Sequence, residues 1–316
     1  MSPVSPVTTS RPPMDAVAAH RWLEGRIPGD TGAQAWLHGE VARRMESRLQ
    51  WMRQAPDRWI DWSPSLGGWE AGQLLAQRYP QAQGVRVESA PLRRAQAQDR
   101  LAVPWWQFWK SPSPVLAQAP AGQAQMLWSN MVLHSHPDPE SLLRQWHEAL
   151  AIDGFVMFSC LGPDSLRELR DVYASLGWAA PSHAFTDMHD WGDLLVQAGF
   201  AEPVMDMERI TLTYADPEAL LADLRALGRN LHERRPPGLR GRGWRSQLLD
   251  ALKATRTLPR PGEGDVSHPT SQRLPLTFEI IYGHALKPTP RAKVAPQTQV
   301  PLQDLKAMLG RRPSPG

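Results

Sequence analysis

The segment Asp61 to Gly68 places a carboxylate, two serines and two glycines directly after a short apolar run, Arg58 to Trp62. A turn of this kind, at the carboxyl end of a parallel strand, lies where open α/β sheets bind their ligands. Glu88 follows Gly67 by 21 residues and ends the next apolar run. An acid at about that spacing accepts hydrogen bonds from ribose hydroxyls. The pattern predicts a nucleoside site, and an ordinary strand-to-helix turn beside a surface glutamate is the alternative.

A second chemically distinctive segment lies late in the chain. It carries six arginines against one acid, Glu233: Arg229, Arg234, Arg235, Arg240, Arg242 and Arg245. Guanidinium groups in this number favour an acidic partner, with an attraction that weakens as salt rises. A solvated loop is the alternative interpretation of the same composition.

Two histidine-containing segments are weaker candidates. His134 and His136 either line a substrate pocket or lie in a surface loop after a predicted strand, and the loop is the favoured interpretation. Four polar residues near position 190 have the composition of a metal site: Asp187, His189, Asp190 and Asp193. Asp187, however, stands where a helix starting near Met188 needs its N-cap. We therefore predict no metal site.

The elements that position these residues alternate along the chain. Apolar runs predict strands at 58–62, 84–88, 125–132, 155–160, 208–214 and 276–285. Amphipathic spacing predicts helices within 15–52, interrupted at 25–32, and at 70–79, 139–150, 166–176, 188–198, 217–227 and 243–254. The segment 103–123, rich in tryptophan and proline, is expected to be irregular. This order predicts an α/β doubly wound sheet, mostly parallel, with an antiparallel last strand.

Several segments resemble the malonyl-acyl carrier protein O-methyltransferases of biotin synthesis (the BioC family), within the class I S-adenosylmethionine-dependent methyltransferase superfamily. The segments that carry the resemblance are 126–133, 139–143, 158–170, 185–193, 198–200, 203–208 and 279–285. They also resemble a methyltransferase-fold relative that hydroxylates an arginine during assembly of respiratory complex I. The resemblance is close over roughly 124–287 and looser before that. It implies a Rossmann-like methyltransferase fold with N-terminal helices and a helical insertion.

The resemblance also implies a cofactor and its site. S-adenosyl-L-methionine would be framed by the first turn and held at its ribose by an acid, with a further residue from the fourth strand: Asp61, Ser63, Ser65, Gly67, Glu88 and Asn130. Ser63 and Ser65 stand where the family's D-x-G-x-G-x-G turn has its first two glycines. These substitutions motivate the alternative of a methyltransferase-fold binding or assembly protein that lost its cofactor, beside an arginine-hydroxylase-like relative.

The implied reaction is methylation of the malonyl carboxylate on acyl carrier protein. That carboxylate is already ionised at pH 7, so alignment and water exclusion supply most of the rate and no general base is assigned. The insertion at 215–275 corresponds to the family's substrate lid. We expect its arginines, Arg234, Arg235 and Arg240, to dock the acidic carrier protein.

Composition limits the remaining classes of function. The formal charge of +3 resides in a proline-rich tail with six basic residues from Lys287 onward, which leaves the body with 29 basic and 31 acidic residues. Nucleic-acid binding is therefore not expected. No apolar run reaches the roughly 18 residues of a membrane span. One cysteine, Cys160, excludes intrachain disulfides and favours a cytoplasmic setting. We expect tails at 1–14 and 288–316 around one methyltransferase-like domain at 15–287.

Overall fold

The computed structural model describes residues 14–25, 36–52, 55–102, 106, 113–236, 238, 240–255 and 273–290. Its seven-stranded sheet has the order β3-β2-β1-β4-β5-β7-β6. The strands are β1 (Arg58–Trp62), β2 (Gln83–Val87), β3 (Val115–Leu116), β4 (Ala124–Ser129), β5 (Leu150–Leu161), β6 (Ala201–Tyr214) and β7 (Leu274–Leu286). Strands β1 to β5 pair in parallel, whereas β7 runs antiparallel to both β5 and β6. The predicted doubly wound sheet and its antiparallel last strand are confirmed.

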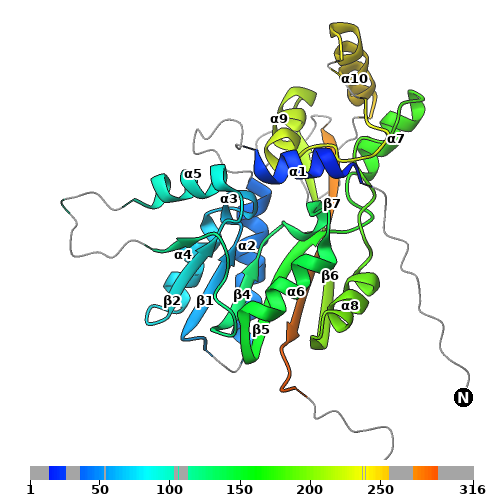
Figure 1. The fold of residues 1–316 in the computed structure, drawn as a ribbon. Helices are drawn as coiled ribbons and strands as arrows, with labels where there is room; N and C mark the ends of the chain where they lie inside the picture. The colour runs from blue at the N-terminus through cyan, green and yellow to red at the C-terminus, as the bar shows by residue number, and fades with distance from the viewer. Residues whose placement is uncertain are drawn as a thin grey trace, which may run out of the picture.

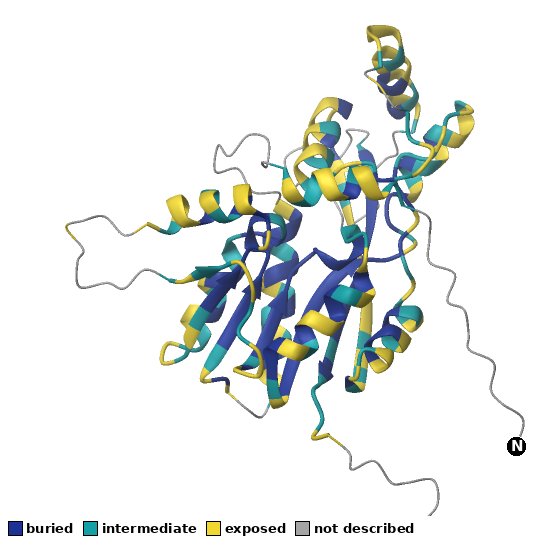
Figure 2. Cartoon of the chain, viewed as in Figure 1, coloured by how far each residue is buried: buried dark blue, intermediate teal, exposed yellow. Residues whose placement is uncertain are grey.

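Helices cover both faces of this sheet, as Figure 1 shows. On one face lie α2 (Trp36–Arg48), followed by η1 (Leu49–Trp51), and α4 (Glu70–Arg78), while α6 (Pro139–Ala149) and α8 (Met188–Gln197) cover the other. Adjacent strand residues point to opposite faces, so Trp59 packs with α2 and α4 and Ile60 packs with α6. The strands are mostly buried and the outer sides of the helices exposed (Figure 2). Two apolar cores therefore enclose the sheet.

A third group of helices gathers beyond the carboxyl edge of β1 and β4 (Figure 1). It comprises α1 (Ala16–Glu24), α7 (Arg167–Ser175), α9 (Pro217–Leu227) and α10 (Arg242–Ala254). Just before α1, Met14 forms a β-bridge with His232, and the Asp15 N–H donates to the Leu231 carbonyl at 2.8 Å. At the other end of α1, Arg93 of α5 (Pro91–Leu101) donates to the Leu23 carbonyl at 2.6 Å. These contacts fasten α1 between the insertion and the body.

The main differences from the predicted elements have local causes. Helix α5 was not predicted, because it buries only Arg93 and Ala97 and so shows no apolar stripe. Strand β6 starts at Ala201 instead of Glu208, since its first half is an exposed edge that pairs only with β7. Strand β3 lies inside the segment expected to be irregular. Much of that segment (103–105 and 107–112), most of both predicted tails, and 256–272 lie outside the described residues.

None of the described helices is long and apolar enough to cross a membrane.

Candidate functional site

The turn after β1 keeps the backbone of a glycine-rich loop although serines replace two of the expected glycines. Ser63 has φ 52° and ψ 54°, the left-handed region that favours glycine. Its carbonyl accepts the N–H groups of Leu66 and Gly67, which begins the short helix α3 (Pro64–Gly67). Holding a side chain in this conformation costs roughly 1–2 kcal/mol. The surrounding structure therefore imposes the shape of the turn on an unfavourable residue.

Gly67 is required by a close approach between this turn and the end of β4. A Cβ at Gly67 would lie 2.2 Å from the Asn130 carbonyl oxygen. The Asn130 amide group donates to the carbonyls of Gly67 at 2.5 Å and His38 at 3.0 Å. The Ser159 hydroxyl donates to Asn130 Oδ1 at 2.8 Å. Asn130 thus ties the turn to α2 and β5, and its side chain is already committed to contacts within the protein.

Glu88 follows β2 and faces the same turn. Its side chain is buried, and Oε1 accepts the Ser65 N–H at 2.8 Å. Burial raises the pKa of this carboxyl group, whereas hydrogen bonding from Ser65 and the charges of Arg93 and Arg94 lower it. The predicted ribose acid and the predicted cofactor turn are therefore in direct contact at the switch point of the sheet.

Asp61, one residue before the end of β1, is a buried acid. Its Oδ2 is 3.1 Å from the position that a Cβ on Gly72 of α4 would occupy, and it has no hydrogen-bond partner among the described residues. Burial raises the Asp61 pKa to about 7, with the charge of Arg86 lowering it and that of Glu88 raising it. The Ser65 hydroxyl is also buried without a partner in the described part of the chain. An unsatisfied buried group costs about 1–3 kcal/mol, as expected where a polar ligand completes the site.

Known proteins are similar to this sequence over most of its length. It is 40% identical over 270 residues to the malonyl-[acyl-carrier protein] O-methyltransferase of Laribacter hongkongensis, covering 82% of this chain and 85% of that protein. The protein of the same name from Gallionella capsiferriformans is 38% identical over 82% of this chain and 87% of its own.

The chain belongs to the malonyl-[acyl-carrier protein] O-methyltransferase family.

Solved structures agree with this family at the level of the fold. The YcgJ protein from a Bacillus matches with a TM-score of 0.50 at 13% identity, covering 79% of this chain and 99% of that one. A candidate methyltransferase of Bacillus halodurans matches with the same TM-score at 14% identity, over 79% and 100% of the two chains. No protein-family model matches the sequence.

In this methyltransferase-family chain an apolar cavity of about 280 Å³ lies between the carboxyl edge of the sheet and the insertion. Its apolar lining includes Leu221, Leu224 and Leu248 from α9 and α10. His134, in η3 (Leu133–Ser135), also lines it and is only 9% exposed. The prediction of a surface loop for His134 was wrong, because η3 turns under the insertion instead of into solvent.

Two histidines form a neutral polar patch on this cavity. His183 Nε2 donates to the His134 carbonyl at 2.8 Å, and the Leu161 N–H donates to His134 Nδ1 at 3.3 Å. Burial lowers the pKa of both imidazoles, so both are uncharged at pH 7. No three His, Cys, Asp or Glu side chains of the described residues are grouped to hold a metal ion. The predicted capping role of Asp187 is confirmed by the His189 N–H, which donates to Oδ1 at 2.8 Å.

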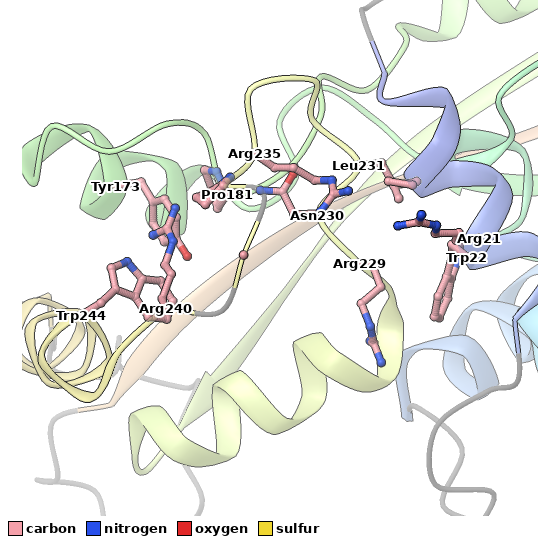
Figure 3. Close-up of a pocket in the computed structure, with 13 residues that line it drawn as sticks. Arg21, Trp22, Tyr173, Pro181, Arg229, Asn230, Leu231, Arg235, Arg240 and Trp244 are labelled. Carbon is pink, nitrogen blue, oxygen red and sulfur yellow. The ribbon is translucent and has the colours of Figure 1, made fainter.

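A second, more open cavity of about 540 Å³ adjoins the first; it is called the arginine pocket here (Figure 3). Arg235 and Arg240 line it, and Arg235 pairs with Asp15 at 3.0 Å. Arg240 lies over the Trp244 ring, 4.5 Å from its centroid. Arg234 is not among the lining residues; its side chain is 80% exposed and lies 3.9 Å from Glu233. Of the three predicted docking arginines, Arg235 and Arg240 therefore line the pocket, and Arg234 lies on the surface.

The contribution of α1 and α7 to this pocket was not predicted from the sequence. Arg21 and Trp22 come from α1, and Tyr173 comes from α7 (Figure 3). No local signal links these positions to the insertion, since they are separated from it by about 50 to 210 residues of chain. The fastening of α1 to the residues around Leu231 brings Arg21 and Trp22 to the insertion. Contacts of Tyr173 with Trp178 and Arg240 bring in α7.

Proposed function

We propose that this protein transfers the methyl group of S-adenosyl-L-methionine to the free carboxylate of a malonyl group carried by acyl carrier protein. The relatives that carry this name cover more than four fifths of the chain at up to 40% identity. The observation that supports it best is the contact between Glu88 and the Ser65 N–H, which sets an acid against the turn at the switch point of the sheet.

The residues present fit the cofactor. Ser63 adopts the backbone that a glycine would supply, and Gly67 permits the close approach of β4. Glu88 would accept hydrogen bonds from the ribose, and the unpartnered Ser65 hydroxyl would face the methionine portion. Asn130 holds the turn against α2, and Asp61 is buried beside α4. When bound, S-adenosyl-L-methionine supplies an electrophilic methyl group on a positively charged sulfur.

The residues outside the turn would bind and align the acceptor. Transfer to an ionised carboxylate forms an O–CH₃ bond, breaks an S–CH₃ bond and moves no proton, so no base is required. The apolar cavity under α9 and α10 excludes water from this encounter. His134 and His183, both uncharged, offer polar contacts there without pairing strongly with the carboxylate. The cytoplasmic setting favoured by the single cysteine stays a prediction.

The first test measures cofactor binding. Calorimetric titration of the purified protein with S-adenosyl-L-methionine should give saturable binding. Glu88→Gln, which keeps an acceptor for the Ser65 N–H but loses the charge, should weaken it about tenfold or more. Glu148→Ala, an exposed acid on α6, is the matched control and should bind as the unmodified protein does. Mass spectrometry should then detect one methyl ester on malonyl-acyl carrier protein.

Absence of binding in the unmodified protein would contradict the proposal and favour a cofactor-free binding or assembly protein. Binding without ester formation on any malonyl thioester would contradict the acceptor, and hydroxylation of a partner arginine would then be the next activity to assay.

A further inference from the structure

Helix α5 buries an arginine at a position where packing would be satisfied by an apolar residue. The buried side chains of this helix are those of Arg93 and Ala97, and Arg93 is only 1% exposed. Arginine is almost never fully buried in proteins unless its charge is paired. The partners of this guanidinium group should therefore indicate what it does.

Two of the three guanidinium nitrogens bind the end of α1. Arg93 Nε donates to the Leu23 carbonyl at 2.6 Å, and Nη2 donates to the Trp22 carbonyl. Both carbonyls lie in the last turn of α1, where carbonyl groups lack partners within the helix and a positive charge is favoured. The guanidinium carbon also lies 5.3 Å from the centroid of the Trp22 ring. Helix α1 therefore fixes the position of Arg93.

The charge of Arg93 acts on Glu88, the acid that faces the turn at 61–68. The third nitrogen, Nη1, is buried and has no hydrogen-bond partner among the described residues. Burial lowers the pKa of Arg93 to about 10, and the charge of Glu88 opposes that change. Burial likewise raises the pKa of Glu88, whereas hydrogen bonding from Ser65 and then the charges of Arg93 and Arg94 lower it. Arg93 and Glu88 thus stabilise each other's charged form without a direct hydrogen bond.

Other contacts hold the backbone and one carboxylate oxygen of Glu88 in place. Oε1 accepts the Ser65 N–H at 2.8 Å, and Arg94 donates to the Glu88 carbonyl at 3.0 Å. Asp61 of β1 is a further acid whose charge interacts with Glu88, and this repulsion opposes ionisation of both. A protonated carboxyl group accepts fewer hydrogen bonds than a carboxylate does. What Arg93 adds is therefore the charge that keeps Glu88 an acceptor.

We propose that Arg93 is a positioning residue of the cofactor site: held in place by α1, it keeps Glu88 a charged acceptor for the ribose hydroxyls of S-adenosyl-L-methionine. The identity of the ligand rests on the proposed function, whereas the interaction between Arg93 and Glu88 is a property of the protein without ligand. Arg93 acts through Glu88 and touches neither the cofactor nor the acceptor. The attachment of α1 consequently influences the affinity for the cofactor.

The experiment measures the Kd of S-adenosyl-L-methionine by calorimetry as a function of pH. The quantity compared is the ratio of each variant's Kd to that of the unmodified protein, in which the titration of the ligand cancels. For Arg93→Gln we expect a ratio of about tenfold or more near pH 6 that falls below about threefold near pH 8.5, because losing the cation raises the pKa of Glu88. Arg93→Lys keeps the charge and should give a ratio that does not vary with pH. Arg144→Gln, an exposed arginine on α6, is the control, and its ratio should stay near one.

Two further measurements show whether the effect passes through Glu88. In a Glu88→Gln background, the additional substitution Arg93→Gln should no longer give a pH-dependent ratio. In the protein without ligand, a carboxyl ¹³C NMR titration should place the midpoint of Glu88 about one pH unit higher in Arg93→Gln than in the unmodified protein. The Glu88 signal is assigned by its loss in Glu88→Gln.

The possible results separate this inference from the proposed function. A ratio for Arg93→Gln that does not vary with pH, or an unchanged midpoint of Glu88, would overturn the positioning role and leave the proposed function intact. If the unmodified protein does not bind the cofactor at any pH, the proposed function is contradicted, and the NMR titration still decides whether Arg93 keeps Glu88 charged. Thermal melting of each variant identifies losses that come from unfolding, which Arg93→Lys and Arg93→Gln should share.

Discussion

At the scale of single residues, the turn at 61–68 has the backbone conformation of a glycine-rich loop, although two of the expected glycines are serines. Ser63 occupies the left-handed region, and Gly67 packs against the Asn130 carbonyl so closely that no Cβ fits. A family turn thus survives two serine substitutions, because hydrogen bonds from Leu66 and Gly67 to the Ser63 carbonyl and from the Ser63 N–H to Val87 hold the chain in place. The left-handed conformation of Ser63 therefore lowers the free energy of unfolding, by an amount that can be measured.

Ser63→Gly should stabilise the protein. Glycine removes roughly 1 kcal/mol of backbone strain at φ 52°, which should raise Tm by about 2–4 °C for a chain of this size. Ser65→Gly is the matched control: Ser65 lies in α3 outside the left-handed region, so glycine there should not stabilise. Thermal unfolding of both variants checks the prediction, which fails if the two substitutions have equal effects.

The raised pKa of Asp61 predicts a pH dependence of stability. With a folded pKa of about 7 and an ordinary value of 3.8, the folded protein retains a proton that the unfolded chain has released. Stability should therefore fall as pH rises from about 4 through 7. Asp61→Asn, which imitates the neutral acid, should gain about 2–3 kcal/mol relative to the unmodified protein between pH 5 and pH 8. Urea unfolding across that range tests this, and parallel stability curves would contradict it.

At the scale of elements, both ends of α1 are attached to other parts of the protein. Its N-terminal end is joined to the insertion through Met14, Asp15 and Arg235, and its C-terminal end to α5 through Arg93. Arg93 donates to the carbonyls of both Trp22 and Leu23 while its own charge lies near Glu88. The helix consequently connects α5, and through Arg93 the surroundings of Glu88, with the arginine pocket.

Replacing Arg93 should weaken the attachment of α1 to α5. Arg93→Met removes two charge-assisted hydrogen bonds and should lower the free energy of unfolding by about 1.5–3 kcal/mol. The amides of α1 should exchange their hydrogens at least tenfold faster, measured by mass spectrometry. Gln98→Met, an exposed change on the same helix, provides the comparison. Unchanged protection of α1 would show that the insertion alone holds it.

At the scale of the whole molecule, a stretch with six arginines against one acid, 229–245, belongs to the insertion, whose residues line the arginine pocket. Arg234 lies outside that pocket and is 80% exposed, which makes it a probe of the surface that a carrier protein would meet. The same end of the molecule carries α1, α9 and α10 (Figure 1).

Charge reversal at Arg234 should slow association with an acidic carrier protein. We expect Arg234→Glu to lower the association rate constant about threefold to tenfold at low salt, and the difference from the unmodified protein to shrink above physiological ionic strength. Arg144→Glu on α6 is the control. Stopped-flow measurements over a salt series decide the matter; an equal, salt-independent effect of both variants would eliminate steering by Arg234.

The amino-acid sequence by itself predicted the doubly wound sheet, the antiparallel last strand, the capping role of Asp187 and the placing of Glu88 in one site with the turn at 61–68. Those features follow from apolar periodicity and from motif spacing, which are local. Only the tertiary structure decided that Ser63 keeps a glycine-like backbone, that Asn130 is consumed by internal hydrogen bonds, that His134 is buried, and that Arg21 and Arg229 face one cavity. Each of these depends on partners distant along the chain, and a residue's own sequence neighbourhood holds no record of which distant group will satisfy it.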